Sequence, residues 1–105
     1  MIPRTFDPKA PTEVVVLTFD YTKDLRAGET LTGTPTTYIS LHKGDDAGYA
    51  AVVSGAPQID ATSKKVLQQV QGGVLAVDYL LYTVCATNQG RNLECYGVLP
   101  VRRIY

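Results

Sequence analysis

The side chains that most often carry out catalysis are sparse in this sequence. His42 is the only histidine, and no nucleophile motif places a serine or cysteine beside it. Asp20 and Asp24 lie one helical turn apart, which suits a general acid and base but equally suits the capping of a short helical turn, the interpretation that we favour. The sequence therefore predicts no catalytic residue and a protein that is not an enzyme.

Metal, cofactor and substrate sites are not indicated either. The carboxylates of residues 44–46, Gly-Asp-Asp, lack the alternating ligands and closing glutamate of a calcium loop, which favours a solvated turn. Cys85 and Cys95 lie ten residues apart, unlike the paired cysteines of a zinc site, and we expect buried thiols. The glycines at 55, 72 and 73 lack the lysine of a phosphate-binding loop. We expect no metal, no cofactor and no small-molecule substrate.

The charge balance also narrows the choice of partners. Ten basic residues offset ten acidic ones, so electrostatics favour neither nucleic acid nor an anionic membrane. The longest mainly apolar stretch, residues 73–85, is interrupted by Asp78 and is too short to span a bilayer, and the N-terminus lacks the pattern of a signal peptide. We expect a soluble protein made in a cytosol, with no nucleic-acid or membrane partner.

The pattern of strands and turns predicts one all-β domain. Residues 1–12 contain three prolines and no periodicity, which indicates an extended N-terminal arm that depends on something else for its order. Residues 13–105 then form the domain. Turn signals recur about every ten residues, and the expected strands are 14–19, 29–32, 38–41, 49–53, 65–71, 77–87 and 92–103. About seven short strands are typical of an immunoglobulin-like antiparallel β-sandwich, with a small barrel as the alternative.

The segment "DYTKDLRAG", residues 20–28, interrupts the extended structure. Asp20 or Thr22 could cap a single helical turn, Leu25 could pack that turn onto the core, and Gly28 could end it with a positive φ. We expect this segment to close one end of the core where the chain crosses between sheets. Tyr79 stands where such sandwiches often place a tyrosine that ties down a corner, although an ordinary core tyrosine fits equally well.

The final hairpin has two apolar faces. Its expected loop, residues 88–90, would place Cys85 opposite Leu93 and leave Cys95 diagonal to Cys85, which disfavours a disulfide. One face carries Tyr79, Leu81, Cys85, Leu93, Cys95, Leu99 and Val101, and the other carries Leu80, Tyr82, Val84, Ala86, Tyr96 and Val98. Since both faces cannot pack into one core, either another segment of the chain or a neighbouring molecule must cover the second face.

The order of these features resembles a known family. The strings "EVVVLTFDYTKDLRAGETL", "VSGAPQI", "VLQQVQGGVLAVDYLLYTVCATNQGRNLE" and "LPVR" are similar to the phage fiber-tail adaptor family over roughly residues 7–103. The resemblance implies a bacteriophage virion structural protein, an immunoglobulin-like module in several copies that links the tail tube, nozzle or baseplate to receptor-binding fibers. It also implies location in the virion tail after synthesis and assembly in the cytoplasm of a bacterial host.

The expected partners are other phage tail proteins and copies of the chain itself. The predicted interface consists of Ile2, Phe6, Leu80, Tyr82, Val84, Tyr96, Val98 and Arg102. One alternative is a head–tail connector or a capsid decoration protein. Another is a host-surface binding module that acts through loops 43–48, 54–57 and 88–92.

Overall fold

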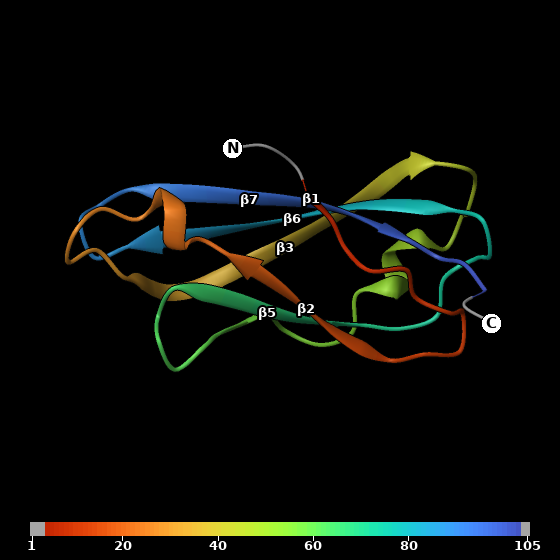
Figure 1. Ribbon diagram of the computed structural model, residues 1–105, viewed down its shortest axis with the longest axis horizontal. Helices are drawn as coiled ribbons and strands as arrows, with labels where there is room; N and C mark the ends of the chain where they lie inside the picture. The colour runs from red at the N-terminus through yellow and green to blue at the C-terminus, as the bar shows by residue number, and fades with distance from the viewer. Residues whose placement is uncertain (1–3, 104–105) are drawn as a thin grey trace.

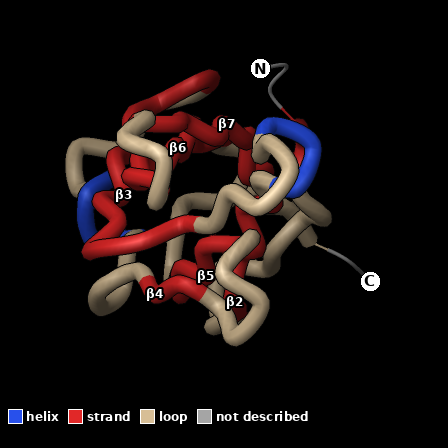
Figure 2. Tube along the Cα trace, turned by 90° about the vertical axis from the view of Figure 1, so that its left-hand side faces the viewer, coloured by secondary structure: helices blue, strands red, loops and turns tan. Residues whose placement is uncertain are grey.

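Two antiparallel sheets face each other in the computed structural model, which describes residues 4–103 (Figure 1). Viewed along the long axis, the sheets form two layers (Figure 2). One sheet contains β3 (Leu31–Lys43), β6 (Asp78–Thr87) and β7 (Asn92–Pro100), and the other contains β2 (Val15–Asp20), β5 (Lys65–Val70) and β4 (Gln58–Ile59). The prediction of an all-β fold is confirmed, but the antiparallel strands number six rather than about seven. A further short strand, β1 (Arg4–Thr5), belongs to the arm and pairs in parallel with β7.

The core lies between the sheets and follows the period-two pattern of the sequence. Leu17 and Phe19 point inward from β2, and Val66 and Val70 point inward from β5. Gln68, a polar residue on the inward face of β5, is completely buried. Its amide donates hydrogen bonds to the carbonyl oxygens of residues 54, 55 and 69 and accepts one from the hydroxyl of residue 37. A buried amide with all these partners is compatible with a stable core.

The predicted register of the final hairpin is confirmed. Cys85 pairs with Leu93, and the Thr87 amide donates to the Arg91 carbonyl at 2.8 Å. Gly90 closes the loop at φ +80°, a conformation that costs glycine little. Cys85 and Cys95 are both buried and are not joined in a disulfide.

Two segments differ from the predicted strands. Residues 49–53 were expected to be extended, but Tyr49–Val52 form the 3-10 turn η2. The Asp46 carboxylate accepts from the Gly48 amide at 2.9 Å and so stabilises the start of this turn, and the two alanines have little preference for a sheet. The expected strands 29–32 and 38–41 were predicted as separate, but residues 31–32 and 38–41 belong to the single long strand β3, whereas residues 29–30 precede it. The pairing of β3 with β6 is interrupted between Thr32 and Thr36.

The remaining helical segment is the 3-10 turn η1 (Thr22–Asp24), which occupies the predicted interruption after β2. Asp20 accepts from the amide and the hydroxyl of Thr22 at 2.9 and 2.6 Å, and Gly28 adopts φ +74°. Leu25 packs against the core as expected. Within residues 4–103, neither helical turn has the length or apolar character to cross a membrane.

The described part of the arm lies along the edge of the β7 strand. The Phe6 amide donates to the Val98 carbonyl and the Lys9 amide donates to the Pro100 carbonyl. The side chains of Phe6 and Lys9 are both buried. The arm therefore extends the β3–β6–β7 sheet by one short parallel strand at its edge.

Candidate functional site

The outer face of the β3–β6–β7 sheet carries a row of three tyrosines. Tyr82 pairs with Tyr38 on one side and with Tyr96 on the other, so one tyrosine comes from each strand. The rings of Tyr38 and Tyr82 stack with centroids 4.9 Å apart, and those of Tyr82 and Tyr96 lie 5.1 Å apart with a tilt of 30°. Cross-strand aromatic pairs of this kind stabilise a sheet and hold their rings in fixed positions. We call this row the tyrosine row.

Apolar side chains from β6 and β7 extend this face on both sides of the tyrosine row. Leu80 pairs with Val98 in the next outward-facing position along the strands, and Val84 pairs with Glu94 on the opposite side. The five hairpin residues predicted to form an interface are all half-buried, namely Leu80, Tyr82, Val84, Tyr96 and Val98. They shield one another laterally, and the described chain provides two layers only, so no third layer covers them. The first of the two predicted possibilities, that another segment of the chain covers this face, is therefore not seen in the described residues.

Tyr96 connects the tyrosine row to a negative charge. Its hydroxyl donates a hydrogen bond to the Glu94 carboxylate two residues earlier on β7. This hydrogen bond to Glu94 raises the pKa of Tyr96. The face therefore combines an aromatic centre with a carboxylate at its rim, a composition typical of protein-binding surfaces.

The other predicted interface residues are Phe6, Arg102 and Ile2. Phe6 is only 6% exposed and packs edge-on against Phe19, so its ring belongs to the chain's own core. Arg102 forms an ion pair with Asp78 at 2.6 Å and also donates to the Val101 carbonyl. Ile2 lies outside the described residues.

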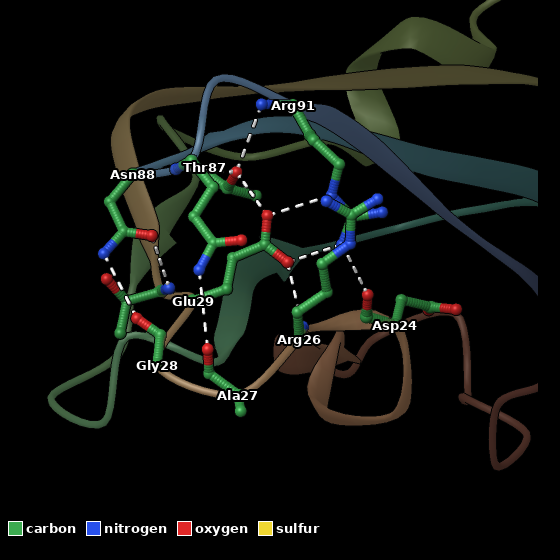
Figure 3. Close-up of polar contacts among 10 residues, drawn as sticks. Asp24, Arg26, Ala27, Gly28, Glu29, Thr87, Asn88 and Arg91 are labelled. Atoms are coloured by element: carbon green, nitrogen blue, oxygen red, sulfur yellow. Dashed lines mark hydrogen bonds and ion pairs between the residues drawn. The ribbon is translucent and has the colours of Figure 1, made fainter.

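A second conspicuous group of polar residues lies at the hairpin end of the sandwich (Figure 3). The Glu29 carboxylate accepts from Nε and Nη2 of Arg91 at 2.9 and 2.5 Å. It also accepts from the Thr87 hydroxyl at 2.7 Å and the Arg26 amide at 2.9 Å. These four hydrogen bonds surround a carboxylate whose side chain has no exposed surface. A buried carboxylate requires such partners to remain charged.

The Glu29 network ties the segment after η1 to the loop of the final hairpin. Arg91 also donates to the Asp24 carbonyl at 2.8 Å, and Asn88 accepts from the Thr30 amide at 3.0 Å. The hydrogen bond from Arg91 keeps the pKa of Glu29 far below its ordinary value. Because donors of the chain itself occupy its oxygens, this carboxylate is a structural anchor and is poorly suited to accept a substrate proton.

Tyr79 closes the opposite end of the sandwich. Of its two predicted roles, a tyrosine that ties down a corner and an ordinary core tyrosine, its hydrogen bonds favour the first. Its hydroxyl accepts from the Val74 amide at 2.8 Å and donates to the Asp46 carboxylate at 2.8 Å. The side chain is completely buried, and burial raises its pKa. The ordinary core interpretation of Tyr79 is therefore incomplete.

Sequence reasoning missed the roles of Glu29 and Asp46. Glu29 was predicted only to begin a strand, although Gly28, Glu29 and Thr30 belong to the first string that carries the family resemblance. Asp46 was assigned to a solvated turn, but it joins η2 to the Tyr79 hydroxyl. In both cases the partner lies more than thirty residues away in the chain, with separations of 62 residues for Glu29 and 33 for Asp46, so local patterns contain no signal for it.

The loops of the host-surface hypothesis do not form one site. Because β3 and β6 are antiparallel, the hairpin loop 88–92 lies beside the start of β3, whereas loop 43–48 follows its other end. Figure 1 places these two loops at opposite ends of the sandwich. Within residues 4–103, the histidine, cysteine and acidic side chains form no group of three or more that could hold a metal ion.

The outer face with its tyrosine row is thus the best-defined candidate for recognition, while the Glu29 and Tyr79 networks hold the ends of the sandwich closed. Comparisons of the chain with protein-family models, with curated proteins and with solved structures gave no match.

Proposed function

We propose that this protein is a bacteriophage virion structural protein, a tail adaptor that links the tail tube, nozzle or baseplate to receptor-binding fibers. The observation that carries the proposal is the outer face of the β3–β6–β7 sheet, where the tyrosine row lies among half-buried apolar residues. The sequence resemblance supplies the biological setting. In this proposal the protein acts by binding other tail proteins and copies of itself, and it is not an enzyme.

We also infer that the sandwich is immunoglobulin-like, and its topology supports this. Immunoglobulin domains place strands A, B, E and D in one sheet and C, F and G in the other. If β2 to β7 are taken as B to G, the observed orders β2–β5–β4 and β3–β6–β7 become B–E–D and C–F–G. Tyr79 near the start of β6 then occupies the place of the tyrosine corner in strand F.

The tyrosine row is well suited to bind a protein surface. Tyrosine rings offer a large contact area at a small cost in side-chain entropy. Stacking against Tyr82 already restricts Tyr38 and Tyr96, so little further ordering is needed when a partner binds. Pairing of the three strands places the three rings side by side on one face of the sheet, where a neighbouring subunit can cover them.

Substitutions in the tyrosine row test this function in assembled particles. Tyr82→Ala and Tyr96→Ala should each weaken association by about 2 kcal/mol, because aromatic anchors dominate such interfaces. We expect virions carrying either variant to contain fewer copies of the protein and fewer fibers, measured by quantitative mass spectrometry and electron microscopy. Val16→Ala, which changes an exposed side chain on the opposite sheet, is the matched control.

Thermal unfolding of each purified variant separates loss of binding from loss of folding. The proposal requires that occupancy falls for the tyrosine variants while the variants remain folded. Full occupancy in particles that carry both tyrosine substitutions would reject this face as the assembly surface.

A further inference from the structure

The arm occupies a defined seat on the edge of β7. Its backbone contributes three hydrogen bonds, from the Phe6 amide to the Val98 carbonyl at 2.8 Å, from the Lys9 amide to the Pro100 carbonyl at 3.0 Å, and from the Arg102 amide to the Lys9 carbonyl at 2.9 Å. Together with the parallel pairing of Arg4 with Gly97 and of Thr5 with Val98, these hydrogen bonds place the arm along residues 97–102. The seat is therefore a strand edge that recognises an extended segment by main-chain pairing.

A notch over Gly97 fixes the position of the arm along this edge. A side chain at Gly97 would collide with Phe6, because a Cβ atom there would lie 2.2 Å from Cε2 of the phenyl ring. The ring passes over the glycine and packs against Phe19 with centroids 5.2 Å apart. The absence of a side chain at residue 97 is what allows an aromatic residue of the arm to enter the core.

Lys9 anchors the other end of the seated segment. Its side chain is only 1% exposed, and Nζ donates to the Ala10 carbonyl at 2.8 Å and to the Gly72 carbonyl. Gly72 belongs to the turn between β5 and β6, far from the arm in sequence. The seat on β7 therefore binds a segment in which an aromatic residue is followed three residues later by a lysine.

A short turn connects the arm to the sandwich. Residues 10–13 form a tight turn in which the Glu13 amide donates to the Ala10 carbonyl at 3.0 Å and the Glu13 carboxylate accepts from the Ala10 amide at 2.7 Å. Ala10 precedes Pro11, and a residue before proline favours an extended conformation. A groove of about 380 Å³ lies between residues 5–9 and β2, and the ring of Phe6 contacts Phe19 on that strand.

We propose that the β7 seat also accepts the arm of a second copy of this protein, so that neighbouring copies exchange residues 4–9. Opening the turn at residues 10–13 would release the arm from its own seat without changing the seat itself. The second copy is the occupant that fits, because its arm carries the same phenylalanine, lysine and backbone spacing that the structure shows in place. Exchange of an identical element between copies is a low-cost route to association.

Exchange of this kind joins different surfaces on the two copies. The arm of one copy binds the β7 edge of the next, which is a head-to-tail contact that closes into a ring when the rotation between copies permits. The biological role of such a ring, as an assembly of several copies around a phage tail, rests on the proposed function. The exchange itself is a property of the purified chain.

Split cysteine pairs test the exchange directly. Thr5 pairs with Val98 in the parallel ladder, so one copy carries Thr5→Cys and a second copy carries Val98→Cys. The two proteins are unfolded, mixed, refolded together at high concentration and oxidised. We expect a covalent dimer linked between residues 5 and 98, identified by peptide mapping, at several times the yield of a control mixture in which Thr12→Cys replaces Thr5→Cys. The native Cys85 and Cys95 are buried and present in both mixtures.

Deletion of Pro11 and Thr12 provides a second measurement. The shortened turn cannot return the arm to its own seat, so we expect folded oligomers by light scattering and a higher yield of the linkage between chains. Equal yields in the matched and control mixtures would overturn the proposal. The proposal would also be overturned if a single chain carrying both Thr5→Cys and Val98→Cys formed this disulfide within itself while the two split variants formed none between them. Either result leaves the adaptor proposal standing, because that proposal is tested by the tyrosine variants in virions.

Discussion

The carboxylate of Glu29 and the guanidinium of Arg91 form two hydrogen bonds across 62 residues of sequence and join the segment after η1 to the loop of the final hairpin. Glu29 has no exposed side-chain surface, whereas Arg91 retains partial contact with solvent. A buried carboxylate whose partner is removed leaves an uncompensated charge, which costs more than the loss of one exposed contact. The stability of this end of the sandwich therefore depends on the charge of Glu29.

We predict that this pair makes the protein sensitive to acid. The pKa of Glu29 is lower in the folded state than in the unfolded chain, so the unfolded chain binds a proton first as the pH falls. The stabilisation is complete above about pH 4.5, the ordinary pKa of glutamate, and is lost progressively as the pH falls below it. Glu29→Gln should lower the unfolding free energy at neutral pH and weaken its dependence on pH in the acid range.

Urea denaturation at a series of pH values measures both effects. Asp45→Asn, at an exposed position in the loop after β3, is the control and should behave like the unmodified protein. If Glu29→Gln retained the full acid dependence, the assignment of this effect to the Glu29–Arg91 pair would be wrong.

We predict that Tyr79→Phe lowers the unfolding free energy by about 1–3 kcal/mol, the range for leaving buried polar groups unpaired. The substitution keeps the ring but removes the acceptor of the Val74 amide and the donor to Asp46. Tyr38→Phe, which removes a hydroxyl from a side chain that is 47% exposed, is the matched control. Equal losses in the two variants, measured by urea denaturation, would show that the corner hydrogen bonds contribute nothing specific.

We predict that Gly97→Ala destabilises the folded protein by about 1–3 kcal/mol, as overpacking in a core does. The new methyl group would collide with the ring of Phe6. The cost should be nearly absent in a Phe6→Ala background, because the clashing ring is gone. Gly48→Ala, where an added Cβ would meet the Asp46 carboxylate at an ordinary 3.6 Å, is the control. An unchanged cost in both backgrounds would mean that the arm does not seat over Gly97.

Local patterns predicted the features that depend on neighbouring residues. Alternation along β5 placed Val66, Gln68 and Val70 inward, and the turn at Gly90 set the register of β6 and β7. Both follow from short-range rules of side-chain direction and turn geometry. The division of the final hairpin into an inner and an outer face follows from the same alternation and is confirmed by its burial pattern.

Sequence reasoning missed features that depend on distant partners or on competition between local structures. Tyr38 was predicted to lie on a strand, but only the pairing of β3 with β6 shows that it stacks on Tyr82. The 3-10 turn η2 replaced an expected strand because an aspartate three residues before Tyr49 offers a local alternative to sheet pairing. Whether a short mixed segment becomes a strand is decided by such competition, which composition does not reveal.

The parallel alignment of the arm with β7 determines how the molecule responds to mechanical tension between its two chain ends. The arm enters the ladder at its N-terminal side, and β7 leaves it at its C-terminal side, so the two ends point in opposite directions along the same pair of strands. Pulling on them shears the main-chain bonds of Phe6, Lys9 and Arg102 together instead of unzipping them one after another. The Phe6 ring packed over Gly97 resists the same sliding motion, so backbone pairing and side-chain packing oppose a pull together.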